Sequence, residues 1–469
     1  MKNRAYLFGI VLVAVIGGLL FGYDTAVISG AEQGLQQFFA AASDFSYTDA
    51  WHGLTTSSAL IGCIIGAFLS GIMAGRLGRK KSLFIAGICF FISAWGSYAP
   101  ETWILAKEPT LTLCVIFNLY RVLGGIGVGL ASAICPMYIA EIAPASRRGA
   151  LVSWNQFAII FGQLVVYFVN YLIIQAHIND PAIQEWTREI GWRVMFGSEC
   201  VPAGLFTLLI LLVPESPRYL VLTGRDREAL TVLARINGES KAAEIVEEIR
   251  QTVAEKREHI LTYGWIVIFV GVMLSVFQQA VGINAVLYFA PRIFASVGLN
   301  NPMVFTVLMG IVNISFTLLA IFTVERLGRK PLLITGSLLM AIGALLFAGT
   351  NMVEMPAWVS VMSILIYSAA FMFSWGPICW VYMSELFPNT IRSQATAIAV
   401  AFQWIFNFIV SSTFVPMYNF SHSMVYIIYG VICLIAALFV YKLVPETKGK
   451  TLEQMTALWK NRSGNTKEF

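Results

Sequence analysis

At 469 residues, the chain combines 58% apolar side chains with only 12% charged ones, whereas soluble domains carry about 25% charged residues. Its mean hydropathy of +0.73 excludes a soluble globular protein. The net charge of +5 does not indicate a nucleic-acid partner, because the Lys and Arg residues are spread over short loops and form no single basic stripe.

Twelve apolar runs follow one another along the chain. A membrane helix needs about 20 apolar residues, and the first run is expected to be retained because it has no small-residue cleavage site. The sequence therefore predicts an all-α membrane protein with twelve transmembrane helices. The runs cover residues 6–28, 54–74, 82–98, 111–140, 150–174, 194–213, 260–290, 302–323, 331–350, 357–386, 394–417 and 424–443.

Basic residues set the expected orientation. With the N-terminus in the cytoplasm, 26 of the 31 Lys and Arg residues lie on that side, Arg121 lies in the membrane, and only Lys107, Arg188, Arg193 and Arg292 lie outside. Because cytoplasmic loops carry the excess of Lys and Arg, we expect both termini in the cytoplasm.

One polar insert separates the sixth and seventh runs. It is rich in charge and has apolar residues at helical spacing, which predicts short amphipathic helices under the bundle. The insert is either a cytoplasmic latch or a solvated linker. The expected organisation is a six-helix bundle at 1–213, the linker at 214–258, a second six-helix bundle at 259–446 and a cytoplasmic tail at 447–469.

Three motifs occur twice, in the same order in each half. GRLGRK at 75–80 recurs as ERLGRK at 325–330, and VPESPR at 213–218 recurs as VPETKG at 444–449. A spaced pattern of Tyr, Glu, Pro and Arg begins at Tyr138 and again at Tyr382. Such an ordered repeat indicates duplicated halves, and parallel halves with a substrate held between them are a known transporter plan.

Three charged residues fall within the predicted spans, where a charge costs about 2.5–3.5 kcal/mol and needs a partner or a function. Helix direction places Asp24, Arg121 and Glu199 in the outer half of the membrane. We hypothesise that Asp24 binds a coupling proton, that Arg121 holds Asp24 ionised when no proton is bound, and that Glu199 is a second acceptor for Arg121. Burial favours a neutral carboxyl and a nearby guanidinium an ionised one, so a change of distance can load and release a proton. The alternative is a static ion pair that fixes helix packing.

Uncharged amides and aromatic residues gather at mid-depth in several spans. Asn and Gln donate and accept hydrogen bonds, as the hydroxyls of a neutral polyol require, and aromatic rings pack on its C–H faces. Gly282 is expected to break the seventh span and turn several amides one way. The alternative role of the amides is hydrogen bonding between helices. The predicted sugar contacts are Gln156, Gln163, Gln278, Gln279, Asn284, Asn313, Gly376, Trp380, Gln403 and Trp404.

Charged residues of the repeated motifs lie at cytoplasmic helix ends. Opposite charges there can pair while the sugar site faces outward, and breaking the pairs would open the inner mouth. The same residues are topology determinants under the positive-inside rule, and we expect both roles. The predicted gating residues are Arg76, Arg79, Glu141, Arg148, Glu215, Arg218, Glu325, Arg326, Arg329, Glu385, Arg392 and Glu446.

Taken together, the motifs resemble the sugar-porter branch of the major facilitator superfamily over nearly the whole chain. Within the membrane the resemblance rests on LLFGYDTAVISG (19–30), NQFAIIFGQ (155–163), FQQAVGIN (277–284), SWGPICW (374–380) and FQW (402–404). One departure is Gly75, where members often carry an acid. The resemblance implies a major facilitator fold of two pseudo-symmetric six-helix bundles and adds Phe21 and Tyr288 as aromatic contacts to the sugar.

These features predict a proton-coupled monosaccharide symporter that works by alternating access, in a bacterial inner membrane. The resemblance favours D-xylose, with glucose or another hexose next. The alternatives are an uncoupled sugar facilitator on the same fold and a membrane sugar sensor, which is expected to carry a longer cytoplasmic tail. We expect a monomer whose partners are the sugar, the proton and the lipid bilayer.

Neither an enzyme nor a metal or cofactor protein is predicted. The seven Cys residues fall in apolar stretches, so neither a disulfide framework nor a Cys metal site is expected. The four His residues show no ligand spacing. GGIGVG at 124–129 lies in an apolar helix with no preceding strand, which favours close helix packing over phosphate binding.

Overall fold

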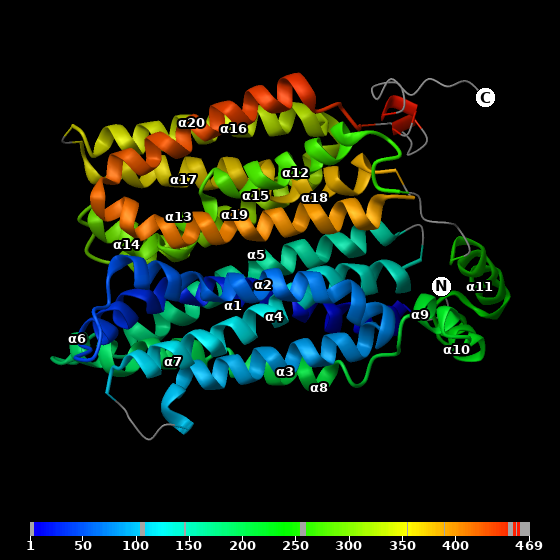
Figure 1. Cartoon of the computed structure of the whole chain (residues 1–469), viewed down its shortest axis with the longest axis horizontal. Helices are drawn as coiled ribbons and strands as arrows, with labels where there is room; N and C mark the ends of the chain where they lie inside the picture. Colours follow the sequence, from blue (N-terminus) through cyan, green and yellow to red (C-terminus); the bar gives the residue numbers. More distant parts are fainter. Residues whose placement is uncertain are drawn as a thin grey trace. The chain divides into compact units, whose positions relative to one another are not determined.

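The computed structural model describes residues 4–103, 108–144, 147–253, 259–353, 355–388, 390–448, 454–455 and 457–459. All regular secondary structure in these ranges is helical (Figure 1). Hydrocarbon offers the backbone no hydrogen-bond partner, so a spanning segment must satisfy its N–H and C=O groups internally. The prediction of an all-α membrane protein is confirmed.

The first compact unit contains residues 1–46 and 58–256. In this unit α1 lies along α5, and α3 lies along α4. Its long helices are α1 (Arg4–Ala40), α2 (Asp49–Arg76), α3 (Arg79–Tyr98), α4 (Leu111–Ile142) and α5 (Arg148–Gln175). A short 3-10 turn covers Pro100–Trp103, and α6 (Ile183–Trp186) follows α5.

The sixth span is interrupted at a buried carboxylate. A π-helical turn, η3 (Thr187–Gly191), leads into α7 (Trp192–Gly197), and the helix resumes after Glu199 as α8 (Cys200–Leu209). Pro202 has no N–H to donate to the carbonyl of Ser198, four residues earlier, so the α-helical ladder lacks a hydrogen bond at this point. Among the described residues, eleven helices are long and apolar enough to cross a membrane. The interrupted span is the twelfth.

The polar insert folds into short amphipathic helices, as predicted. They are α9 (Pro217–Leu222), α10 (Asp226–Asn237) and α11 (Glu239–Val253). The insert belongs to the first unit, where α10 lies beside the start of α1 (Figure 1). There the guanidinium of Arg235 lies 5.9 Å from the centre of the Tyr6 ring.

The second compact unit contains residues 47–57 and 257–469. In this unit α16 lies along α20, and α12 lies along α19 (Figure 1). Its helices are α12 (Trp265–Ala280), α13 (Ile283–Tyr288), α14 (Ala290–Ser296), α15 (Pro302–Leu327), α16 (Arg329–Thr350), α17 (Ala357–Phe373), α18 (Trp375–Leu386), α19 (Arg392–Phe420) and α20 (His422–Leu443).

Two spans of the second unit are broken near their middle. The seventh breaks at Gly282, as predicted, where φ is +90°. A Cβ on Gly282 would lie 2.4 Å from the Tyr429 ring, so both the backbone angle and the packing require glycine. The tenth breaks at Ser374, between α17 and α18.

The first turns of α2 pack within the second unit. Asn419 near the end of α19 donates to the Asp49 carboxylate at 2.7 Å. A Cβ on Gly53 would lie only 2.1 Å from the carbonyl oxygen of Ser412, so the two backbones approach as closely as glycine allows. The helix α2 therefore begins in one unit and ends in the other.

The end of the chain is anchored to the second unit by a tryptophan. Trp459 is 1% exposed, and its indole N–H donates to the carbonyl oxygen of Leu386, the last residue of α18, at 3.0 Å. Met455 is also 1% exposed. Part of the predicted tail therefore packs against the bundle.

Replacing Trp459 with alanine tests this anchor. Loss of a fully buried aromatic ring costs about 3–5 kcal/mol in typical cores, so Trp459→Ala should clearly lower the apparent Tm of the purified protein in detergent. Trp358→Ala, which removes a ring that is 67% exposed in the same unit, should leave the Tm nearly unchanged. Equal Tm shifts for the two variants would contradict the anchor.

Candidate functional site

Asp24 and Arg121 form a buried ion pair between α1 and α4. Arg121 Nη1 donates to Asp24 Oδ1 at 2.5 Å, and Nη2 donates to the Asp24 backbone carbonyl at 3.1 Å. The two side chains are 3% exposed for Arg121 and 0% for Asp24. The guanidinium also lies 4.9 Å from the centre of the Phe196 ring of α7, whose face attracts a cation. Three spans therefore meet at one positive charge.

Glu199 lies at the break of the sixth span and is fully buried. Neither of its carboxylate oxygens accepts a hydrogen bond from a described donor, and neither does Asp24 Oδ2. The predicted role of Glu199 as a second acceptor for Arg121 is thus not seen in this structure. Glu199 lies near both Asp24 and Arg121, so two buried acids share the surroundings of one cation.

The predicted sugar contacts of the first unit lie on α1 and α5. Gln163 is buried, and its Oε1 has no donor among the described residues. Gln156 and Phe21 are half-buried. Asn155 was not predicted, although it too is buried and its Oδ1 lacks a described donor. The sequence does contain a signal for Asn155, because it is a second amide directly before Gln156.

Gln278 is the centre of a hydrogen-bonded set in the second unit. Its Nε2 donates to the carbonyl oxygens of Trp375 at 3.0 Å and Gly376 at 3.3 Å. Its Oε1 accepts a hydrogen bond from Gln403 Nε2. The break at Ser374 places these two carbonyls at the start of α18, so the amides of α12 and α19 are fixed against the broken tenth span.

Two more amides of this unit are held by neighbours. Asn284 donates to Gln279 Oε1 at 2.6 Å, across the break at Gly282. Ser368 donates to Asn313 Oδ1 at 2.6 Å. Asn313 Nδ2 and Gln403 Oε1 have no partner among the described residues. A buried donor and a buried acceptor thus remain for a ligand or water. Of the aromatic residues, Tyr288 and Trp404 are buried and Trp380 is half-buried.

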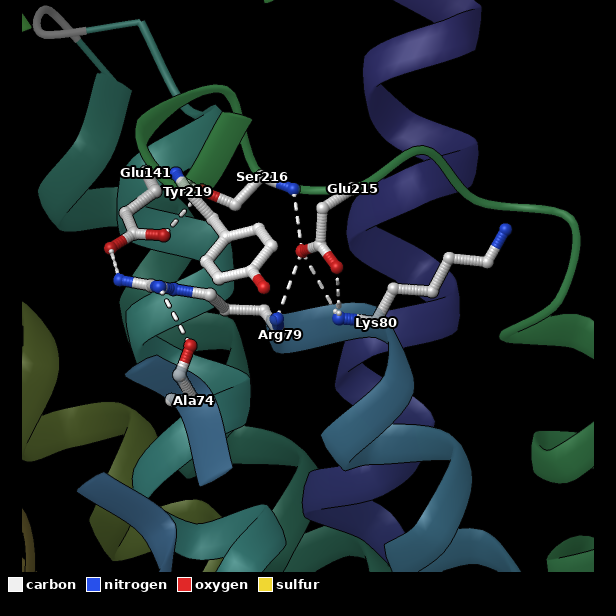
Figure 2. Close-up of polar contacts among 7 residues, drawn as sticks. All are labelled: Ala74, Arg79, Lys80, Glu141, Glu215, Ser216 and Tyr219. Atoms are coloured by element: carbon white, nitrogen blue, oxygen red, sulfur yellow. Dashed lines mark hydrogen bonds and ion pairs between the residues drawn. The ribbon is translucent and has the colours of Figure 1, made fainter. Parts of the chain in front are cut away.

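Charged residues of the repeated motifs form a compact cluster at the start of α3 (Figure 2). Arg79 Nη2 donates to Glu141 at 2.6 Å, and Nη1 donates to the carbonyl of Ala74 at 3.0 Å. The second Glu141 oxygen accepts from the Ser216 hydroxyl at 2.5 Å. Glu215 accepts the backbone N–H groups of Arg79 at 2.9 Å and Lys80 at 3.2 Å. Gly78, at the start of α3, has no side chain that could accept a hydrogen bond from the first N–H groups of the helix. The carboxylate of Glu215, 136 positions from Arg79 along the chain, accepts them instead.

The same arrangement recurs at the start of α16 in the second unit. Arg329 donates to Glu385 at 2.8 Å, and the Thr447 hydroxyl donates to the other Glu385 oxygen at 2.6 Å. Glu446 accepts the backbone N–H groups of Arg329 at 3.1 Å and Lys330 at 2.9 Å. Each of these ion pairs joins helices within one unit. The gating role of these residues stays a prediction.

The other predicted gating residues take different positions. The guanidinium of Arg392 donates to the carbonyl of Phe387 at 3.1 Å. The carbonyls of Arg76 and Arg326 accept hydrogen bonds from Tyr219 and Lys448, respectively. Arg76, Arg218 and Arg326 are exposed. The side chains of Arg148 and Glu325 lie outside the described part of the chain.

Glu446 makes the stability of this cluster depend on pH. Partial burial alone would raise its pKa, but hydrogen bonds from the backbone N–H groups of Lys448, Lys330, Arg329 and Thr447 outweigh burial and hold the pKa below its ordinary value of 4.5. A carboxyl with a depressed pKa in the folded state stabilises the protein above about pH 4.5 and loses that contribution as the pH falls through the folded pKa.

Glu446→Gln should therefore lower the apparent Tm at pH 7, and the difference from the original chain should shrink progressively below about pH 4.5. Glu228→Gln provides the control, because Glu228 pairs with Arg225 on an exposed surface, where such pairs stabilise little. A Glu446→Gln difference that stays constant from pH 7 to below pH 4 would refute the carboxylate cap.

Comparison with known proteins identifies the family. Residues 10–459 match the family model described as sugar (and other) transporter. The D-xylose-proton symporter of Escherichia coli (strain K12) is 49% identical over 99% of this chain and 98% of that relative. The glucose facilitated diffusion protein of Zymomonas mobilis is 36% identical over 96% of this chain and 97% of that protein.

Solved structures agree with the sequence comparison. The inward-open conformation of the xylose transporter XylE from E. coli superposes with a TM-score of 0.88 at 48% identity, over 97% of this chain and all of that one. The XylE structure bound to 6-bromo-6-deoxy-D-glucose, described as a major facilitator superfamily proton:xylose symporter, gives a TM-score of 0.81 over 97% of this chain. The chain belongs to the sugar (and other) transporter family, and it has the twelve-helix major facilitator fold.

Proposed function

We propose that this chain is a proton-coupled monosaccharide symporter whose preferred substrate is D-xylose, with glucose or another hexose next. The relative with 49% identity is named a D-xylose-proton symporter, and a relative with 36% identity is named an arabinose-proton symporter. Both names describe a sugar carried with a proton. The family consists of transporters, so no covalent chemistry is required.

The observation that carries the coupling assignment is the buried pair of Asp24 and Arg121. Similarity alone does not decide between a symporter and a facilitator, since one relative of 36% identity is named for facilitated diffusion. Asp24 is 0% exposed, and its Oδ2 faces no described donor. A buried carboxylate exists either ionised beside a cation or neutral with a proton. Movement of Arg121 relative to Asp24 would switch between these two forms.

The energy of one proton suffices for accumulation. A proton that moves down about 100 mV supplies roughly 2.3 kcal/mol, which supports about 50-fold sugar accumulation at one-to-one stoichiometry. The proton is the coupling ion, and the proposal requires no other cofactor.

The amides of the second unit support a neutral polyol as the substrate. Gln278, Gln403 and Asn313 are buried and uncharged, and they leave a donor and an acceptor without a described partner. Sugar hydroxyls supply both functions. We propose that these amides bind the sugar together with the remaining predicted contacts.

The multi-pass chain is proposed to lie in a bacterial inner membrane with both termini in the cytoplasm, because 26 of its 31 Lys and Arg residues then lie on that side. We propose that it works as a monomer by alternating access. The clusters around Arg79 and Arg329 would then lie at the cytoplasmic helix ends, where their charges regulate opening of the inner mouth.

Asp24→Asn tests the coupling assignment. In liposomes with an imposed proton gradient, the variant should lose uphill accumulation of labelled xylose while exchange of sugar at equal concentrations continues, because asparagine binds no proton but leaves the amide site intact. Asp180→Asn, which changes an exposed acid, should accumulate sugar normally. Accumulation by Asp24→Asn at the original level would reject Asp24 as the proton carrier.

Gln278→Ala tests the sugar site. It removes the side chain that binds Gln403 and the carbonyls of Trp375 and Gly376, so the Kd for xylose, measured by calorimetry, should rise by roughly 10-fold or more. Asn351→Ala removes an exposed amide that donates to the Phe347 carbonyl, and should leave the Kd unchanged. An unaltered Kd in a folded Gln278→Ala protein would rule this amide out as a sugar contact.

A further inference from the structure

A second hydrogen bond joins the two chain segments that carry the buried acids. The Tyr23 hydroxyl lies 2.7 Å from Ser198 Oγ, and Ser198 Oγ lies 2.5 Å from the carbonyl oxygen of Met195. Because a serine hydroxyl has one hydrogen and Ser198 gives it to Met195, Tyr23 must be the donor to Ser198. Tyr23 is only 3% exposed.

Each residue of this hydrogen bond is the sequence neighbour of one of the two buried acids. Tyr23 precedes Asp24 on α1, and Ser198 precedes Glu199 at the break of the sixth span. Ser198 and Glu199 lie between α7 and α8, where Pro202 leaves the carbonyl of Ser198 without the N–H of the residue four positions later, so the helical ladder is weakened at this point. The hydrogen bond from Tyr23 fixes this point of the chain against α1.

The position of Glu199 matters because its charge is not compensated directly. Arg121 is bonded to Asp24, and both Glu199 oxygens lack a described donor. Two acids beside one cation cannot both stay ionised at low energetic cost in a buried site. The distance between the acids therefore affects how tightly the pair holds a proton. The charged and titratable groups near the pair are Tyr23 on α1, Cys63 on α2, Arg121 on α4 and Cys200 on α8.

We infer that the hydrogen bond from Tyr23 to Ser198 is a positioning contact that holds Glu199 against Asp24 and thereby sets the pH at which the proton site loads. The inference rests on the proposed role of Asp24 in proton coupling. Tyr23 and Ser198 are positioning residues, since neither needs to bind the proton or the sugar. Loss of the contact lets the two acids separate, which weakens their shared hold on a proton.

Tyr23→Phe and Ser198→Ala each remove the hydrogen bond and keep most of the side-chain volume. In proton-driven xylose uptake measured as a function of pH, each variant should move the alkaline midpoint to lower pH by about half a unit or more, as expected for loss of one buried hydrogen bond. The double variant should shift the midpoint no further than either single variant does, because both substitutions remove the same hydrogen bond. Sugar exchange at equal concentrations should be unchanged, because the amides are untouched.

Two matched variants separate positioning from general damage. Ser198→Thr keeps the hydroxyl and should retain the original midpoint. Thr25→Val removes a buried hydroxyl next to Asp24 that bonds only to carbonyls of its own helix, and should also retain it. An unshifted midpoint in both Tyr23→Phe and Ser198→Ala would overturn the inference, whether or not the Tm falls. A failure of the proposed function would look different from a failure of this inference. If Asp24 did not couple the proton, the Asp24→Asn variant would still accumulate xylose.

Discussion

The ion pair between Asp24 and Arg121 is the contact on which the first half depends. It joins α1 to α4, and the stacking of Arg121 on Phe196 brings in the sixth span. Loss of Arg121 would leave the ionised Asp24 buried without a compensating charge, which is strongly destabilising. A proton can replace the cation as the partner of the acid, and a sugar transporter that contains this pair therefore has a means of coupling.

The clusters around Arg79 and Arg329 show one structural solution used twice. In each half a carboxylate after the last span caps a helix that begins after glycine, Glu215 for α3 and Glu446 for α16. An arginine from the capped helix then pairs with an acid of a neighbouring span. These contacts stiffen each half internally, which suits a transporter whose halves move as rigid bodies.

Much of this fold was predictable, because lipid requires long apolar helices and the duplication repeats its motifs. The break at Gly282 was predictable from glycine among amides. The break at Glu199 was not predicted, although Pro202 was its signal. The contact between Tyr23 and Ser198 joins residues 175 positions apart with no sequence pattern, and Trp459 lies in a polar tail without periodicity. Such contacts depend on tertiary packing, which periodicity does not encode.

In a symporter, sugar and proton move together through the same chain. The most direct measurement uses liposomes loaded with a pH-sensitive dye and given an inward xylose gradient without an imposed pH gradient. If the chain is a symporter, the interior should acidify as xylose enters, with about one proton for each sugar. Entry of xylose at the same rate with no change of internal pH would contradict coupling and identify the protein as a facilitator.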